Sequence, residues 1–125
     1  LLPFKTLMTQ ILIDTNMFLS IFELNVDLIS RIEDNYGKNK VFTLDIVTDE
    51  LKNKGKHGQA ALQLIQALQI PVETYKGDKQ ADEAILDYAE QHNCILATQD
   101  KELAQKAKRK ALKTLRIRSK SYLIE

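Results

Sequence analysis

The sequence predicts an α/β fold, a three-layer α/β/α sandwich around a mostly parallel sheet. Residues 11–13 and 94–97 are short, uninterrupted apolar runs, as expected of strands that helices cover on both faces. Segments with helical spacing of apolar residues separate the predicted strands, and this alternation is typical of βαβ units. The length of 125 residues and the 44% hydrophobic content indicate one domain with a substantial core.

The predicted elements follow one another along the chain with turn residues between them. Strands are expected over residues 10–14, 41–43, 71–75, 94–97 and 113–117. Helices are expected over residues 16–24, 25–36, 45–53, 59–69, 79–92 and 100–110. The tail, residues 119–125, is expected to be coil or an edge strand.

Each helix has its own signal in the sequence. Residues 16–24 are apolar nearly all round, which suits a short buried helix. Asn25 is expected to be the N-cap of the next helix, in which Leu28 and Ile32 keep helical spacing. Residues 54–58 are interpreted as a break, because two glycines flank basic residues there.

Composition limits the classes of function. Lys and Arg total 18 against 17 Asp and Glu, so the net charge of +1 neither favours nor excludes a polyanionic partner. The single cysteine, Cys94, excludes a disulfide framework. No apolar run approaches the roughly 20 residues that span a bilayer, so no membrane association and a cytoplasmic location are expected. Because the chain does not begin with Met, we expect residues 1–7 to be either a leader or residues foreign to a natural protein that starts at Met8. The domain is expected to cover residues 8–125.

Two carboxylates stand at the ends of predicted buried strands. Asp14 ends the first strand, and Asp100 closely follows the strand over residues 94–97. The carboxyl ends of parallel strands meet at one edge of a sheet, where open α/β folds bind ligands. Each acid is equally compatible with a plain helix N-cap.

Two further acids fall on inward faces of predicted helices. Glu50 lies four residues after Ile46 and three after Val47, so it is expected on the buried face or its rim. Asp82 shares a helical stripe with the apolar Ile85. The alternatives are a solvated acid for Glu50 and, for Asp82, a first-turn acid that complements the helix dipole.

A convergence of these carboxylates predicts a cation site. Two like charges about 4 Å apart cost several kcal/mol at an effective dielectric of about 20, so cations or protons must neutralise the group. Ligands that are all oxygen suit Mg²⁺ or Mn²⁺. His57 and His92 form no zinc pattern and are expected to be ordinary surface residues. Carboxylate-held pairs of such ions recur in phosphodiester hydrolysis.

The residues resemble the PIN-domain nucleases. The resemblance rests on the motifs Ile11-Leu12-Ile13-Asp14-Thr15-Asn16, Asp49-Glu50-Leu51, Ala81-Asp82-Glu83-Ala84-Ile85 and Ala97-Thr98-Gln99-Asp100-Lys101-Glu102-Leu103. It covers residues 10–123 and implies a Rossmann-like sandwich and Mg²⁺- or Mn²⁺-dependent endoribonuclease activity. The positions that match the family's four acids are Asp14, Glu50, Asp82 and Asp100. Asn16 and Thr98 match its supporting polar residues.

The resemblance also implies partners. Residues 115–123 are similar to archaeal PIN proteins related to ribosomal-RNA processing factors, whereas another branch contains VapC-type toxins that an antitoxin silences. RNA, a ribosomal precursor and an antitoxin are therefore the expected partners. A homodimer is expected from family habit and from the apolar residues 17–24. The chain departs from the family at Gln99, where many relatives carry Asn, and in a fourth motif with few acids.

Basic residues flank the predicted acidic site. Lys52, Lys54, Lys56, Arg116 and Arg118 are expected to contact an RNA backbone, and the alternative is a solvated charged face. Two other classes of function stay open. One is a non-catalytic RNA-binding or ribosome-assembly factor on the same fold. The other is a phospho-acceptor receiver-like domain, for which Asp45 is a poor acceptor because it does not end a convincing middle strand.

Overall fold

The computed structural model describes residues 9–37, 39–119 and 122–124. The expected leader, residues 1–7, lies outside these ranges. Within them the chain forms a six-stranded sheet in the order β3-β2-β1-β4-β5-β6. The strands are β1 (Thr9–Ile13), β2 (Asn39–Leu44), β3 (Val72–Glu73), β4 (Ile95–Ala97), β5 (Thr114–Ser119) and β6 (Tyr122–Ile124).

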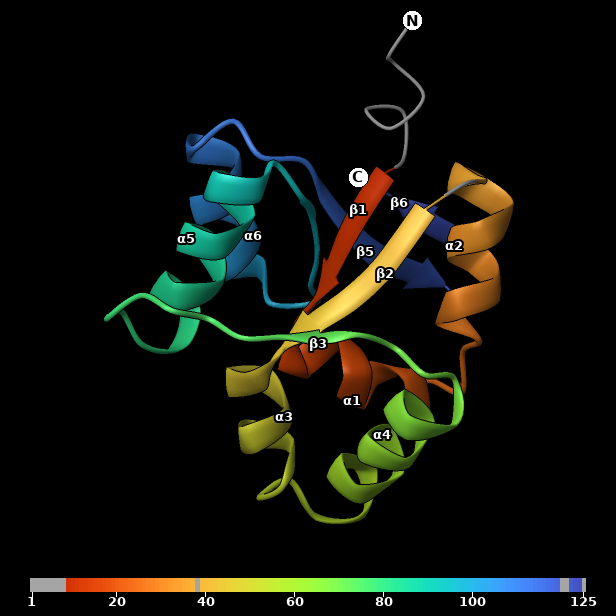
Figure 1. Cartoon of the computed structure of the whole chain (residues 1–125). Coiled ribbons are helices and arrows are strands. Elements are labelled where there is room, and N and C mark those ends of the chain that lie inside the picture. Colours follow the sequence, from red (N-terminus) through yellow and green to blue (C-terminus); the bar gives the residue numbers. More distant parts are fainter. Residues whose placement is uncertain (1–8, 38, 120–121, 125) are drawn as a thin grey trace, which may run out of the picture.

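Helices cover both faces of this sheet, which confirms the predicted three-layer sandwich. Figure 1 shows α5 and α6 on one face and α1 and α2 on the other, whereas α4 packs against α1 and α3. The helices are α1 (Thr15–Glu23), α2 (Leu28–Tyr36), α3 (Asp45–Leu51), α4 (Gly55–Ala67), α5 (Ala81–His92) and α6 (Lys101–Arg109).

The sheet is parallel from β3 to β5, and only β6 runs antiparallel to its neighbour, β5. The two apolar runs predicted as buried strands lie at its centre, with Ile11 paired to Ile95 and Leu12 to Leu96. Ile11 and Leu12 are fully buried, because helices cover both of their faces. Within the predicted tail, residues 122–124 form the edge strand β6, one of the two expected alternatives.

The expected start of the second helix was wrong. Asn25 does not cap it but turns the chain in a left-handed conformation, with φ of 54°. Asp27 is the cap, and its carboxylate accepts hydrogen bonds from the backbone N and the hydroxyl of Ser30. Asn and Asp both suit caps and turns, so the sequence alone did not separate the two positions.

The chain does break between α3 and α4, as expected, but the break does not extend to residue 58, because α4 already begins at Gly55. Gly55 makes the turn between α3 and α4 with φ of +67°, where L side chains are strained. Gly58 has a different role inside α4. A Cβ atom there would lie 2.1 Å from the carbonyl oxygen of Leu51, so this glycine lets the two helices pack closely.

Candidate active site

Asp14 lies at the point where the strand order reverses. From β1 the chain continues to β2 and β3 on one side, whereas β4 and β5 extend the sheet on the other. Such a switch point leaves a crevice at the carboxyl ends of the two central strands. Asp14 follows β1 there, is 3% exposed and caps α1 by accepting a hydrogen bond of 2.9 Å from the backbone N of Met17.

Thr98 joins two of the predicted acids. It directly follows β4, and its buried hydroxyl donates a hydrogen bond of 2.5 Å to Oδ2 of Asp14. The same hydroxyl oxygen accepts a hydrogen bond of 3.0 Å from the backbone N of Asp100. Thr98 therefore fixes the Asp14 carboxylate and the start of the Asp100 loop together.

Asp100 is at once a helix cap and a member of this edge. Its Oδ1 accepts hydrogen bonds from the backbone N atoms of Glu102 and Leu103, at 2.9 and 3.2 Å, and so caps α6. Among the described residues, none donates a hydrogen bond to its Oδ2. The N-cap interpretation therefore holds for both Asp14 and Asp100, and it is compatible with a further role at the sheet edge.

Glu50 and Asp82 line a hollow of about 160 Å³ between α3 and α5. Glu50 lies at the exposed rim, and its carboxylate accepts a hydrogen bond from the Thr15 hydroxyl. Sequence reasoning missed Thr15, although its place directly after Asp14 at the strand end was a usable signal. Asp82 is half-buried in the first turn of α5.

The acids influence one another electrostatically. Burial raises the pKa of Asp14 from 3.8 to about 7, hydrogen bonds from Thr98 and Met17 oppose this shift, and the charges of Asp82 and Asp100 add to it. Burial also raises the pKa of Asp82, and the Asp100 carboxylate raises it further. The charge of Lys106 opposes this shift, and the Glu50 carboxylate adds to it. Charges of the other predicted acids therefore oppose ionisation of both Asp14 and Asp82.

The donors of the four predicted acids suit a hard cation, because all of them are oxygen atoms and the charges repel. The four carboxylates are not arranged as a preformed metal-binding site. Within the ranges that the structure describes, no three Asp, Glu, His or Cys side chains converge closely enough to hold a metal ion. The structure thus brings the four predicted acids to one edge of the sheet without showing a metal site.

Comparison with known proteins identifies the family. A family model described as a PIN like domain matches residues 11–120. The chain belongs to the PIN-like domain family.

Two curated proteins are similar to this PIN-like domain. Ribonuclease VapC4 of Methanocaldococcus jannaschii is 32% identical over 125 residues, which cover 92% of this chain and 95% of that protein. Ribonuclease VapC9 of Archaeoglobus fulgidus is 29% identical over 108 residues, which cover 80% of this chain and 76% of that protein.

A solved structure shows the same fold as this PIN-like domain. The PIN domain endonuclease Utp24 superposes with a TM-score of 0.76 at 23% identity, over 91% of this chain and 88% of that one. Among the described residues of the PIN-like domain, no helix is both long and apolar enough to cross a membrane.

The predicted supporting and basic residues divide into several groups. Asn16 is exposed, its carbonyl oxygen accepts a hydrogen bond from the Ser20 hydroxyl, and its side chain contacts none of the four acids through a hydrogen bond in the described ranges. Lys52 is exposed and pairs with Asp49 at 3.2 Å. The other predicted RNA-binding residues are also exposed. Lys54 directly precedes α4, Lys56 lies in α4, and Arg116 and Arg118 lie on β5.

Gln99, at which the chain departs from the family pattern, has a structural role. Its side-chain oxygen accepts a hydrogen bond of 2.6 Å from the backbone N of Ile117, and its side-chain nitrogen donates one of 3.2 Å to the Ile117 oxygen. The amide thus pairs with β5 as a further strand residue would, beyond the end of β4. It holds the loop that carries Thr98 and Asp100.

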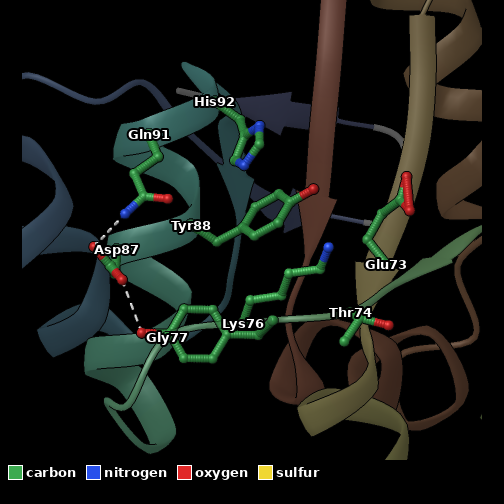
Figure 2. A pocket seen from close by; sticks show the side chains of 9 residues that line it. Glu73, Thr74, Lys76, Gly77, Asp87, Tyr88, Gln91 and His92 are labelled. Carbon is green, nitrogen blue, oxygen red and sulfur yellow. Dashed lines mark hydrogen bonds between the residues drawn. The ribbon is translucent and has the colours of Figure 1, made fainter.

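A separate hollow of about 590 Å³ lies between β3 and α5, away from the acids. Figure 2 shows Tyr88 beside His92 in its wall, and their ring centroids are 4.0 Å apart. Asp87 accepts a hydrogen bond of 2.8 Å from the Tyr75 hydroxyl there. None of the four predicted acids lines this hollow, so it is not part of the candidate active site.

Proposed function

We propose that this PIN-like domain is an Mg²⁺- or Mn²⁺-dependent endoribonuclease. One observation carries the proposal: the buried carboxylate of Asp14 lies at the switch point of the sheet, where the charges of Asp82 and Asp100 reach it. A cation would relieve this repulsion. The similarity to proteins named as ribonucleases supports RNA as the substrate.

The proposed activity assigns metal-binding and orienting roles to different residues. Asp14, Glu50, Asp82 and Asp100 would hold one or two ions, and their oxygen donors suit either cation. When bound, such an ion acts as a Lewis acid that activates water and neutralises charge on the phosphate. Thr98 orients Asp14 through its hydrogen bond, and the Thr15 hydroxyl orients Glu50. Neither His57 nor His92 lines the hollow between Glu50 and Asp82.

The test is a cleavage assay on single-stranded and structured RNAs with Mn²⁺. The parent protein should cut RNA, EDTA should stop the reaction, and Asp14→Asn should slow it at least about 100-fold, as removal of an essential charged group does. Asp27→Asn is a matched control, because Asp27 is also an Asp N-cap but lies exposed on α2. It should cut like the parent.

Two results would contradict the proposal. Cleavage that survives Asp14→Asn would point to a contaminating nuclease. RNA that both proteins bind and neither cuts, with any divalent ion, would favour the alternative function, a non-catalytic RNA-binding or ribosome-assembly factor.

We also propose that this PIN-like domain has an antitoxin as its partner, as VapC-type toxins do, with a ribosomal precursor as the other candidate partner. We propose further that it acts in the cytoplasm as a homodimer. The apolar segment that suggested the dimer is largely used inside the chain, since Met17 and Phe18 are fully buried, whereas Leu24 is 42% exposed. Light scattering at working concentration should give twice the monomer mass. A monomeric mass would exclude the homodimer.

A further inference from the structure

A third hollow, of about 310 Å³, begins at the acidic edge and continues between α6 and β5. Thr98 and Asp100 line the end that meets the candidate active site. Three cationic side chains also line the hollow, among neutral residues, namely Lys101, Lys108 and Arg116. The hollow therefore leads from the carboxylates into positively charged surroundings.

The sequence places these cations on one side of the molecule. Lys101 and Lys108 are seven residues apart on α6 and share a helical stripe, about 10 Å from each other along the axis. Arg116 lies on β5 and is exposed, whereas its neighbours Leu115 and Ile117 are buried. This alternation places Arg116 on the face of β5 opposite to these neighbours, and there it lines the same hollow as residues of α6.

Some basic residues of α6, and Lys110 directly after it, form ion pairs, whereas others do not. Lys106 pairs with Glu83 at 3.5 Å, and Lys110 pairs with Glu90 at 3.6 Å, both across to α5. In the described part of the chain, no carboxylate lies within 4.0 Å of the charged nitrogen atoms of Lys101, Lys108 or Arg116. Three like charges in one hollow repel, so an anion that enters it is attracted by all of them.

We propose that this hollow is a subsite for one or two backbone phosphates of the RNA strand that lies in the active site. The subsite deepens the proposed function and rests on it. The planar guanidinium of Arg116 can donate two hydrogen bonds to one phosphate, and the lysines act as point charges. No aromatic residue lines the hollow, so it binds the backbone and does not select bases.

Binding to a labelled single-stranded RNA, followed by fluorescence anisotropy, tests the subsite without relying on cleavage. All proteins carry Asp14→Asn, so that the RNA stays intact. Lys108→Ala and Arg116→Ala should each raise the Kd about tenfold at low salt. Each should also lower the slope of log Kd against log salt by about 0.7, the value for one lost contact to a single strand.

Lys110→Ala is the matched control. It removes the same charge at the end of the same helix, but Lys110 pairs with Glu90 and lies outside the hollow. Its Kd should stay within about twofold of the Asp14→Asn reference. Equal effects of all three substitutions would mean that only overall charge matters, and this result would overturn the inference.

A single neutral methylphosphonate linkage, moved along the RNA, identifies a direct contact. At one or two positions it should weaken binding to the reference protein but not to Arg116→Ala, because the contact is already lost. Additive effects at every position would also overturn the inference. If the subsite variants behave as expected but no divalent ion supports cleavage by the chain with Asp14 intact, the subsite stands and the proposed endoribonuclease activity fails.

Discussion

At the scale of single residues, Asp14 makes the metal-free fold sensitive to pH. Its pKa is about 7 in the folded protein, against an ordinary value of 3.8. The folded protein therefore binds this proton more tightly than the unfolded chain does. It follows that the free energy of unfolding falls as pH rises from about 4 to 7, and that this group changes it no further above pH 7.

We expect Asp14→Asn to stabilise the metal-free protein. The substitution removes the buried charge and keeps an oxygen that can accept the hydrogen bond from Met17. In urea unfolding with EDTA at pH 8, the free energy of unfolding should rise by up to about 4 kcal/mol. Near pH 4 the difference should become small, because the Asp14 carboxyl of the parent is then protonated in the folded state.

The control for this expectation is again Asp27→Asn. Hydrogen bonds from Ser30 hold the pKa of Asp27 below its usual range, so its charge favours the folded state. The substitution should be neutral or destabilising at pH 8. An Asp14→Asn protein that is less stable than the parent at both pH values would contradict the inference that the buried charge of Asp14 destabilises the folded state.

Some residue roles were within reach of the sequence and others were not. Asp14 and Asp100 could be found because each follows a buried apolar run. The pairing of Thr15 with Glu50 joins α1 to α3, and the pairing of Gln99 with Ile117 joins a loop to β5. Such contacts depend on how elements pack, and neither the periodicity of apolar residues nor a sequence motif reveals them.

At the scale of elements, the close packing of α3 and α4 holds the rim of the candidate active site. Glu50 lies in α3, directly before Leu51, whose carbonyl oxygen meets Gly58 of α4. A side chain at Gly58 would have to push the end of α3 away. Two glycines in a short stretch are typical of a break, so residues 54–58 were all placed there. The sequence does not reveal that Gly58 lies within α4 and packs against the end of α3.

We expect Gly58→Ala to cost about 2–3 kcal/mol of unfolding free energy, since the new Cβ overlaps backbone atoms. Gly55→Ala is the matched control. Its Cβ would meet open space, so only the strain of the positive φ remains, about 1 kcal/mol. Urea unfolding of the two variants makes the comparison. An equal or smaller loss for Gly58→Ala would mean that the helices do not need this close approach.

At the scale of the whole molecule, alternation of strands and helices was sufficient to predict the three layers and the parallel sheet. It could not give the strand order or the antiparallel direction of β6, because these depend on pairing between distant segments. The placement of Asp82 shows the same limit. The connection from β3 through α5 to β4 crosses the sheet and brings Asp82 to the edge where Asp14 lies. This crossover is seen only in the folded chain.

The proposed function depends on one claim, that the acids at this edge form a divalent-cation site. Thermal unfolding at pH 8, with EDTA or with excess Mn²⁺, tests it directly and needs no knowledge of the RNA substrate. Mn²⁺ should raise the Tm of the parent by several degrees, because an ion that binds only the folded state stabilises it. The Tm of Asp14→Asn should stay nearly unchanged on adding Mn²⁺. No shift in the parent, or the same shift in both proteins, would contradict the claim.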